Sequence, residues 1–535
     1  MSFFYKISLT SFVFALLGIS TFFFLPQLIQ YVINKKIQLS EGSILYPIWK
    51  DPPIEIHQSF YFFNVTNSYY VEKHGAKPQL DEIGPFTYRI SVNKVVSKVK
   101  RDNDSICFRE IRSYHFIRSL SVADDTTRVT TLNAPLIIAL NVLAKLPHWL
   151  KEILEEICRG FFVTKSVREL TFAGYPDYLM DFSRYVIPKA KDRYKGKFGY
   201  LVGFNSSDDG DYCVNSGIDN IMKINLIQSV NGRNTLNLWP GSSCNSFNSS
   251  TRGEVSPPMR EGPRKSIQIF VPFFCRKFDL IYQKVHRISS GLETLKYYLD
   301  PLNFANSSIY PPNSCYVPKK GSSPSPKGQK IPSGVFDISP CQYGCPLFLS
   351  KPHFLEADPY YLSTVQGLNP NISRHESWVE VEPVSGTSAQ VMMRFQANLR
   401  TSKKPDLLQA YKIPDMIFPV FWMELSYLID KNLRQELFIA NEVYNLLPSV
   451  IFISFVSFSI LLILIAFVKF LQSKEGAILG FKRTFLFWRQ SETDQQLLVE
   501  PDGDENETTE EDASDSHIPQ SEGERPNEIL SARAH

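Results

Sequence analysis

Residues 446–468 read LLPSVIFISFVSFSILLILIAFV, and none of these 23 residues carries a charge. A second uncharged stretch covers the 27 residues from 7 to 33, ISLTSFVFALLGISTFFFLPQLIQYVI. About 20 consecutive apolar residues cross the hydrocarbon core of a bilayer as a helix. The two stretches therefore predict transmembrane helices at residues 7–33 and 446–468.

A cleavable signal peptide is the alternative interpretation of the first stretch. Its apolar part is longer than the roughly 7–15 apolar residues of a signal peptide. In addition, no small-x-small cleavage site follows residues 22–25. We therefore expect the first stretch to stay in the protein as an anchor.

The charges beside the second stretch predict its orientation. Five cations follow it and two precede it: Lys469, Lys474, Lys482, Arg483 and Arg489, against Lys431 and Arg434. The cytosolic side of a membrane helix carries the excess of Lys and Arg. The charges beside the first stretch do not indicate its orientation, since Lys6 and the amino terminus precede it and Lys35 and Lys36 follow it. We expect residues 1–6 and 469–535 in the cytosol, and 34–445 as a lumenal or extracellular ectodomain.

The region between the two stretches carries all eight cysteines, which indicates an oxidising compartment with structural disulfides. The same region contains six N-x-Ser/Thr sequons, the acceptor pattern for N-glycosylation, at Asn64, Asn103, Asn205, Asn248, Asn306 and Asn371. Cysteines and sequons thus agree with the predicted topology.

The overall composition describes a folded body and an acidic tail. Of the 535 residues, 43% are hydrophobic, which excludes a wholly disordered chain. The net charge of +3 hides 40 acidic and 55 basic residues up to 489, and 14 acidic and 2 basic residues beyond. The cations are spread out and no nucleic-acid-binding motif is present, so we expect no nucleic-acid partner.

Local catalytic motifs are absent from the sequence. The nine histidines are at least 17 residues apart, and there is no GxSxG elbow or phosphate-binding glycine loop. A site assembled from distant residues stays open. We expect no enzyme, no metal site and no cofactor.

Hydrophobic patterning predicts an α+β ectodomain. Short alternating or β-branched runs recur at residues 54–122, 200–238, 266–274, 334–349 and 378–399. Residues 135–185 change to helical spacing: Leu150, Ile153, Leu154 and Ile157 fall on one face of a helix. These patterns predict a large antiparallel sheet or barrel with a helical insert, and a disordered acidic tail beyond residue 490.

Several segments between the two stretches form a recognisable series of motifs: WKDPP (49–53), YFFNVTN (61–67), EIGPFTYR (82–89), VREL (167–170), Gly174-Tyr175, FCR (274–276), PHF (352–354), GLNPN (367–371) with His375, and Glu382-Pro383 with Gly386. These motifs resemble the class B scavenger receptor family, which includes the fatty-acid translocase, the high-density-lipoprotein receptor and the lysosomal integral membrane protein. The resemblance covers about residues 7–470. Taken alone, the Gly-Pro and Asn-Pro segments are turn chemistry, and His353 and His375 are typical of satisfied core or loop histidines.

The resemblance implies an antiparallel β-barrel capped by a membrane-distal helical bundle at residues 135–185. It also implies an apolar tunnel for fatty acids, sterols or their esters. Two cysteine pairs carry over, Cys244 with Cys315 and Cys275 with Cys341. The family's third pair does not, since no cysteine lies between Cys315 and Cys341. Cys107, Cys158, Cys213 and Cys345 stay unassigned, as two further disulfides or as buried thiols.

The ligand-binding residues that we predict lie in and after the helical insert. The family's tunnel-mouth lysine is missing from the aligned stretch EEICRG (155–160), and Arg159 and Lys165 are possible substitutes. Trp149 is the expected anchor of a helix-to-protein interface, with Lys151 on the polar face. A cationic patch that would attract anionic ligands follows, at Lys189, Lys191, Arg193, Lys195 and Lys197. A solvated surface is the alternative for all these charges.

Two functions from different classes remain open. The first is a receptor that binds lipoproteins or anionic phospholipids and moves fatty acids or sterols through the tunnel to the bilayer. The second is a lysosomal membrane sorting receptor for a soluble lysosomal protein. Asp494, Leu497 and Leu498 form a DxxLL pattern that clathrin adaptors recognise in extended tails. We expect residence in the cell membrane, with cycling through endosomes and lysosomes if the pattern is used.

Overall fold

The computed structural model describes residues 2–100, 104–142, 147, 149, 153, 160–181, 196–288, 291–318, 331–402 and 414–496. It divides into two units that are described separately. One consists of Met1–Val13 and Phe458–His535, and the other of Phe14–Ser457.

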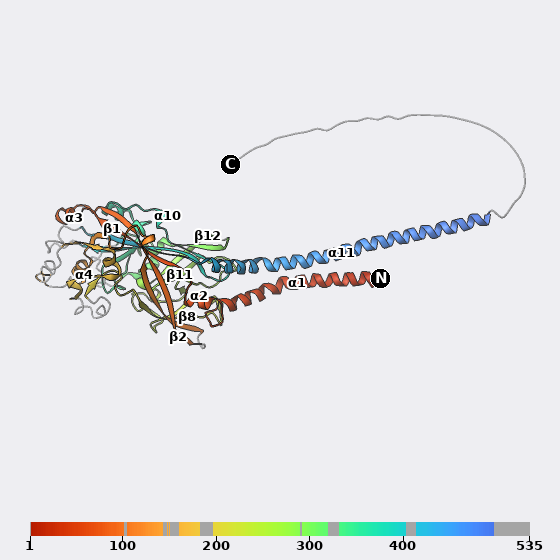
Figure 1. The fold of residues 1–535 in the computed structure, drawn as a ribbon, viewed down its shortest axis with the longest axis horizontal. Coiled ribbons are helices and arrows are strands. Elements are labelled where there is room, and N and C mark those ends of the chain that lie inside the picture. Colours follow the sequence, from red (N-terminus) through yellow and green to blue (C-terminus); the bar gives the residue numbers. More distant parts are fainter. Residues whose placement is uncertain are drawn as a thin grey trace, which may run out of the picture. The chain divides into compact units, whose positions relative to one another are not determined.

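Phe14–Ser457 contains a 14-stranded, nearly closed sheet (Figure 1). Its strands are β1 (Ile56–Val65), β2 (Leu80–Lys100), β3 (Ser105–Phe116), β8 (Ser207–Asn215), β9 (Ile227–Val230), β10 (Ser250–Thr251), β11 (Ser266–Val271), β12 (Arg276–Arg287), β13 (Glu293–Leu299), β14 (Val335–Asp337), β15 (Leu347–Ser350), β16 (Trp378–Val381), β17 (Ser388–Thr401) and β18 (Met416–Leu428).

The main path of the sheet is β10-β11-β12-β13-β16-β17-β18-β1-β2-β3-β8-β9, and β15 joins β14 to β17. All pairs are antiparallel except β10 with β11. The predicted large antiparallel sheet is confirmed.

The alternation of side chains along the central strands determines which residues form the core. In β17, Val391, Met393, Phe395, Ala397 and Leu399 are all buried and lie on one face. Because side chains alternate across a strand, every second residue points to the inside of the curved sheet. These residues belong to one large apolar cluster with their neighbours on β1, β16 and β18.

A glycine permits the close approach of two of these strands. Gly84 lies in β2, beside the bulge between Phe60 and Phe62 of β1. A Cβ atom at Gly84 would lie 2.7 Å from the Tyr61 ring and 2.8 Å from the Phe60 carbonyl oxygen. The sequence suggested turn chemistry here, whereas the structure places Gly84 inside a strand, where only a missing side chain fits.

The helices are α1 (Ser2–Ile37), α2 (Leu45–Lys50), α3 (Ser68–His74), α4 (Ala134–Val142), α8 (Ser242–Asn245), α9 (Pro359–Thr364), α10 (Ile372–His375) and α11 (Lys431–Gln496). Short 3-10 turns cover Arg118–Leu120, Ile221–Lys223, Pro272–Phe274, Pro301–Phe304, Pro311–Tyr316 and Pro352–Phe354, and a π turn covers Glu169–Ala173.

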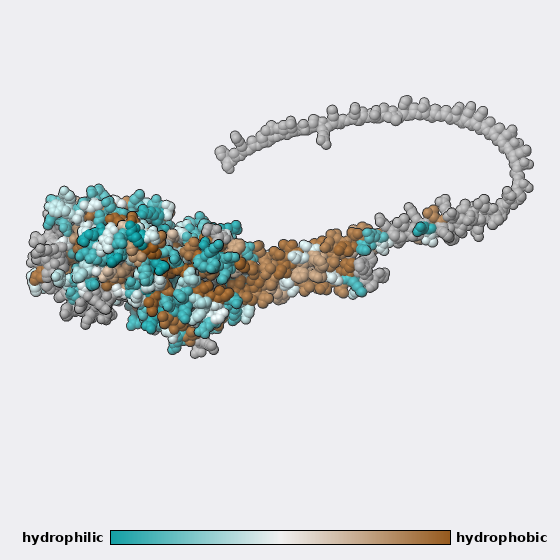
Figure 2. Space-filling model, viewed as in Figure 1, coloured by the Kyte–Doolittle hydropathy of each residue, from teal (hydrophilic) through white to brown (hydrophobic). Residues whose placement is uncertain are grey.

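Two of these helices are long and apolar enough to cross a membrane, at Tyr5–Ile37 and Lys431–Lys474. Both contain the predicted spans and extend beyond them. Apolar side chains cover the outside of α1 and of much of α11, whereas hydrophilic residues dominate the visible surface of the β body (Figure 2). The two helices touch within Phe14–Ser457, where the rings of Phe22 and Phe452 are 5.0 Å apart.

The helical insert differs in part from its prediction. Residues 134–142 form α4, and Trp149 and Ile153 are helical. Residues 162–166, however, form β5, which pairs with β4 (Arg128–Leu132), and β6 (Tyr175–Pro176) pairs with β7 (Lys197–Phe198). Phe162 and Val163 supply β-favouring side chains shortly after Gly160, whose φ is +87°. The described part of residues 135–185 is therefore mixed rather than purely helical.

Three disulfides tie the sheet and its loops together. Both pairs implied by the family resemblance, Cys244–Cys315 and Cys275–Cys341, are present. Cys107, which had no assigned partner, bonds Cys213 across β3 and β8. Cys345 is a free thiol, and burial raises its pKa to about 12. Cys158 lies outside the described residues.

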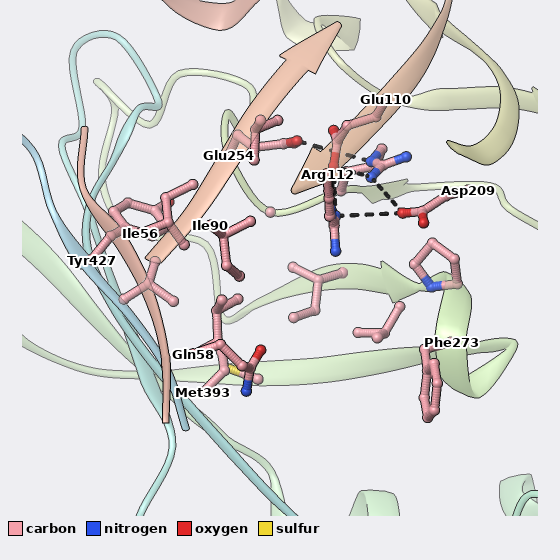
Figure 3. A pocket seen from close by; sticks show the side chains of 18 of the residues that line it. Ile56, Gln58, Ile90, Glu110, Arg112, Asp209, Glu254, Phe273, Met393 and Tyr427 are labelled. Carbon is pink, nitrogen blue, oxygen red and sulfur yellow. Dashed lines mark hydrogen bonds and ion pairs between the residues drawn. The ribbon is translucent and has the colours of Figure 1, made fainter. Parts of the chain in front are cut away.

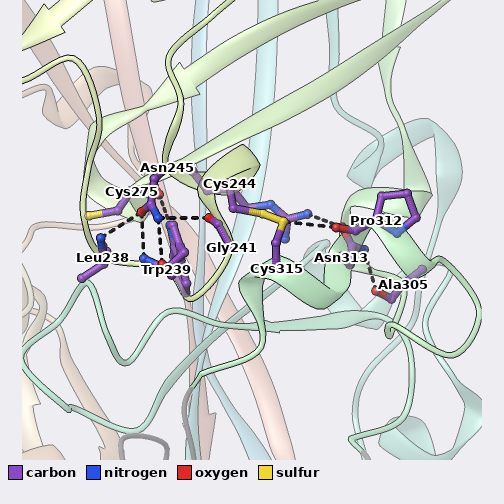
Figure 4. The surroundings of a disulfide bond; sticks show 11 residues. Leu238, Trp239, Gly241, Cys244, Asn245, Cys275, Ala305, Pro312, Asn313 and Cys315 are labelled. Atoms are coloured by element: carbon purple, nitrogen blue, oxygen red, sulfur yellow. Dashed lines mark hydrogen bonds between the residues drawn. A yellow bond between two sulfur atoms is a disulfide. The ribbon is translucent and has the colours of Figure 1, made fainter.

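The Cys244–Cys315 disulfide is held by a loop that Asn245 organises (Figure 4). The Asn245 side chain accepts hydrogen bonds from the backbone N–H groups of Leu238 and Trp239, both at 2.8 Å. It also donates to the carbonyl oxygens of Trp239 and Gly241. A Cβ atom at Gly241 would lie 2.2 Å from the Cys315 Cβ, so the disulfide needs a glycine there.

Candidate ligand cavity

A cavity of about 600 Å³ lies on the inner side of the sheet. Small-molecule sites typically measure roughly 300–1,000 Å³. The cavity begins beside α2, at Leu45 and Trp49, and beside Leu433 at the start of α11. From there it extends along β1, β2, β3, β16, β17 and β18. It thus connects the base of the two long helices with the interior of the sheet.

Most of the cavity wall is apolar because of strand alternation. Every second residue lines the cavity on β17 (Val391, Met393, Phe395), on β18 (Met423, Leu425, Tyr427) and on β1 (Ile56, Gln58, Phe60). In a strand these positions share one face. Such a wall favours the acyl or ring portion of a lipid.

A second cavity of about 110 Å³ adjoins the first. Leu201, Phe273, Phe274, Gln342, Tyr343 and Met423 line both cavities. The second cavity continues to Ile138 of α4 and to Met180. A wall of mainly apolar side chains therefore separates two spaces that together lead from α2 toward α4.

One part of the large cavity is strongly charged. We call Lys94, Glu110, Arg112, Asp209, Arg252 and Glu254 the cavity ion cluster; all six line the cavity. Lys94 and Glu110 are direct partners in the register of β2 and β3. Figure 3 shows Glu110, Arg112, Asp209 and Glu254 on one side of the space, and Gln58 and Met393 on another.

Glu110 is the centre of the cavity ion cluster. Its Oε1 accepts hydrogen bonds from Arg112 Nε at 2.7 Å and Nη2 at 2.6 Å, and lies 2.9 Å from Arg252 Nη2. Burial opposes ionisation of Glu110, but Arg252 and Arg112 outweigh it and hold the Glu110 pKa well below its ordinary value. Burial also disfavours the charges of Arg112 and Arg252, yet Glu110 keeps the pKa of each above its ordinary value. These three side chains are therefore charged.

The remaining contacts of the cavity ion cluster are longer. Lys94 Nζ donates to the Trp49 carbonyl oxygen at 3.0 Å but lies 3.6 Å from Glu110 Oε2 and 3.5 Å from Glu254 Oε1. Asp209 Oδ2 lies 3.6 Å from Arg112 and 3.7 Å from Arg252. Arg252 Nη1, Glu110 Oε2 and Glu254 Oε2 of the cluster, and Trp49 Nε1 beside it, are among the buried atoms of the described residues that have no hydrogen-bond partner.

Glu82, His353 and His375 form another cluster, whose ligand-type atoms lie within 4.8 Å of one another. The two imidazole rings are stacked, 4.3 Å apart and nearly parallel at 5°. An imidazole binds a metal in the plane of its ring, so two stacked rings cannot both bind one ion well. The chemistry of these residues therefore points to hydrogen bonding.

The hydrogen bonds of this cluster fix its charges. Glu82 Oε2 accepts from His353 Nε2 at 2.5 Å and from Trp422 Nε1 at 2.8 Å. Burial raises the Glu82 pKa, but these hydrogen bonds outweigh it and bring the pKa to about 2. Burial lowers the His375 pKa to about 3. Glu82 stays ionised and His375 neutral across the physiological pH range.

Few of the predicted ligand-binding residues fall in the described part of the chain. Trp149 is 61% exposed. Lys165 is half-buried, with its Nζ 4.4 Å from the centre of the Tyr175 ring, and Lys197 is exposed on β7. Lys151, Arg159, Lys189, Lys191, Arg193 and Lys195 lie outside the described residues. Neither Trp149, Lys165 nor Lys197 lines either cavity.

The sequons are spread over the surface of the β body. Asn205, Asn248 and Asn371 are exposed, and Asn64 and Asn306 are half-buried. Asn103 lies outside the described residues. In the tail, α11 continues to Gln496, so Asp494 belongs to a helix, where the sequence suggested an extended segment. Leu497 and Leu498 lie beyond the described residues.

Sequence reasoning missed the cavity ion cluster. The sequence does contain a signal for this cluster in the alternation of side chains along two strands. Ile90, Val92 and Lys94 share one face of β2, and Glu110, Arg112 and Tyr114 share one face of β3. A charge at an inward position of a strand suggests a buried ion pair. Arg252 and Asp209 come from other segments, and sequence spacing does not bring them together.

A large, nearly closed β sheet with an internal cavity and two apolar terminal helices defines the architecture of this chain. The sequence model described as CD36 family matches residues 9–470 of this chain, and the chain belongs to this family.

Curated relatives agree with that assignment. The chain is 31% identical to mouse scavenger receptor class B member 1 over 417 residues, which cover 77% of this chain and 78% of the relative. It is 29% identical to the bovine protein of the same name, with 89% of each chain covered. It is 30% identical to human lysosome membrane protein 2, with 76% of this chain and 81% of the relative covered. Two apolar terminal helices and relatives named as receptors or membrane proteins indicate a membrane protein of a non-enzyme family.

Proposed function

We propose that this chain is a class B scavenger receptor that binds lipoprotein or anionic lipid ligands and moves lipids through its cavity to the membrane. The observation that carries the proposal is the apolar cavity, which reaches from the interior of the sheet to α2 and the start of α11. The transfer needs no ATP, because burial of apolar surface and a concentration gradient drive it.

The proposal includes a topology. Helices α1 and α11 each cross the bilayer, both termini are cytosolic, and the β body with its sequons lies outside the cytosol. The exposed positions of Asn205, Asn248 and Asn371 support glycosylation there. Glycosidase treatment of the full-length chain should lower its mass by several glycans; an unchanged mass contradicts this topology.

Narrowing the cavity tests the transfer step. Leu425 of β18 lines the large cavity, whereas Leu428 on the same strand is 38% exposed and does not. Leu425→Trp places an indole in the cavity and should remove most lipid transfer from bound particles into cells, with particle binding unchanged. Leu428→Trp is the matched control and should leave both intact. Full transfer by a correctly delivered Leu425→Trp receptor contradicts the proposal.

A lysosomal sorting receptor is the second candidate function. The relation to lysosome membrane protein 2 and the exposed helical side chains of Trp149 (61%) and Ile153 (45%) support it. Large exposed apolar side chains are typical anchors of protein interfaces. Native mass spectrometry of the purified full-length protein separates the two candidates: extractable lipid favours the first, and a stoichiometric soluble protein that Trp149→Ala removes favours the second.

The tail carries a proposal about localisation. Asp494, Leu497 and Leu498 would bind clathrin adaptors and direct cycling through endosomes and lysosomes. Since Asp494 lies in the last turn of α11, this binding requires that turn to unwind. Leu497→Ala combined with Leu498→Ala should raise the surface fraction measured by biotinylation. An unchanged surface fraction would leave the cell surface as the site of residence.

A further inference from the structure

The cavity ion cluster gives the proposed lipid cavity a polar side that faces the lipid. Arg112 is half-buried, with 33% of its side-chain surface exposed, and it lines the cavity. Figure 3 shows Arg112 beside Asp209, on the cavity side of Glu110.

The cavity ion cluster has no net charge. Its six side chains carry three positive and three negative formal charges, and the other charged residue of the cavity wall, Asp208, is balanced by Arg109, whose Nη1 lies 3.5 Å from Asp208 Oδ2. Its partly exposed side chains are also mixed: Arg112 (33% exposed) is a donor, and Asp209 (18%) and Glu254 (33%) are acceptors. The cluster therefore offers hydrogen bonds of both kinds without attracting ions of one sign.

We propose that the cavity ion cluster selects an uncharged lipid with a hydroxyl group, such as a long-chain alcohol or a sterol, over an ionised fatty acid. The inference rests on the proposed lipid cavity. A hydroxyl group both donates and accepts, so it can bind a guanidinium and a carboxylate at the same time. A fatty-acid carboxylate would instead add an uncompensated buried charge, which is unfavourable.

Arg112 is not free to bind the fatty-acid carboxylate, because Glu110 already binds its guanidinium. Its Nε and Nη2 both bind Glu110 Oε1, at 2.7 and 2.6 Å. A carboxylate that took this guanidinium in a bidentate pair would displace Glu110, which is 2% exposed and would then lose its closest partner. Breaking a buried pair in this way is strongly unfavourable.

Two ligands with the same chain test the selection. Oleyl alcohol and oleate are titrated at pH 8 into the purified full-length protein in detergent micelles. The wild type should bind oleyl alcohol at least about tenfold more tightly than oleate, which corresponds to about 1.4 kcal/mol. Asp209→Asn removes one negative charge at nearly constant shape and should cancel most of this preference by tightening oleate binding.

A second variant and a control accompany Asp209→Asn. Glu254→Gln removes the same charge from another position, where the carboxylate makes only long contacts of 3.5 and 3.9 Å to cations, and should act in the same direction. Asp211→Asn makes the same change two residues from Asp209, at a carboxylate that accepts from Ser97 and does not line the cavity. It should leave the preference unchanged.

The outcomes separate this inference from the function on which it rests. A wild type that prefers oleate, or a preference that survives both Asp209→Asn and Glu254→Gln, overturns the selection while lipid binding stands. A wild type that binds neither ligand overturns both the selection and the proposed lipid cavity. A preference for oleyl alcohol that only Asp209→Asn and Glu254→Gln reduce supports the selection.

Discussion

Arg252 and Arg276 are both buried arginines of the β body, but they are stabilised in different ways. Arg252 lies 2.9 Å from Glu110 Oε1 in the cavity ion cluster. Arg276 has no carboxylate among its ion-pair partners in the described residues. Its guanidinium lies 4.2 Å from the Tyr316 ring centre and 4.0 Å from the Phe336 ring centre, and its Nη2 donates to Asn313 Oδ1 at 3.1 Å.

The pKa values follow this difference. Burial lowers the pKa of Arg276 to about 10, because aromatic rings compensate a charge less than a carboxylate does. For Arg252, Glu110 outweighs burial and raises the pKa above its ordinary value. Two equally buried arginines can therefore depend to different degrees on a carboxylate partner for their charged state. Arg252 belongs to a charge network, whereas Arg276 acts as a packed side chain beside the Cys275–Cys341 disulfide.

Removing the central anion should give the largest effect. Glu110→Gln leaves Arg112, Arg252 and Lys94 with less negative charge in a buried site. Breaking a buried ion pair costs about 3–5 kcal/mol. We expect a loss of this size in the free energy of unfolding, measured by chemical denaturation of the purified protein in detergent.

An exposed pair supplies the control for this variant. Arg287 and Glu293 are 3.4 Å apart, with side chains 75% and 40% exposed. Exposed pairs contribute at most about 1 kcal/mol. Glu293→Gln should therefore change stability far less than Glu110→Gln. Equal losses would mean that the cavity ion cluster contributes no more than a surface pair.

Glu82 is a half-buried carboxylate that accepts hydrogen bonds from His353 and Trp422 and pairs with Arg374, and the pH dependence of stability should reveal it. Its pKa falls from 4.5 to about 2 on folding. A lowered carboxyl pKa contributes stability that is present above the unfolded value and lost as pH falls toward the folded value. The shift corresponds to on the order of 3 kcal/mol.

Comparison with Glu82→Gln isolates this contribution. The stability difference between the wild type and the variant should be constant between pH 5 and 7 and should shrink as pH falls from about 4.5 toward 2. Denaturation midpoints across this range measure it. A difference that stays constant down to about pH 2 would show that Glu82 does not have the lowered pKa.

The sequence predicted the sheet, the two apolar helices and a mixed fold, because alternation and long uncharged runs are local signals. It did not predict the strand at Phe162–Ser166, since pairing with β4 decides it, or the continuation of α11 to Gln496. It also missed the cavity ion cluster. Lys94 and Glu110 face each other only in the register of β2 and β3, and Arg252 reaches them from a separate segment. The predicted cationic patch lies almost wholly outside the described residues and stays a prediction.

The smallest effect is expected at Arg276 itself. Arg276→Met removes a charge whose burial is unfavourable, as its lowered pKa of about 10 shows, and keeps an apolar stem between Tyr316 and Phe336. The lost cation–π contacts, about 2 kcal/mol when desolvated, largely offset the relief. We expect a change in the free energy of unfolding below about 1 kcal/mol, because replacing a buried charge with an apolar side chain is often neutral. Arg252→Met makes the same chemical change but leaves Glu110 with one cation fewer, and should be destabilising by several-fold more. If Arg276→Met proves as costly as Arg252→Met, aromatic rings support a buried guanidinium as strongly as a carboxylate does, and the distinction between the two arginines fails.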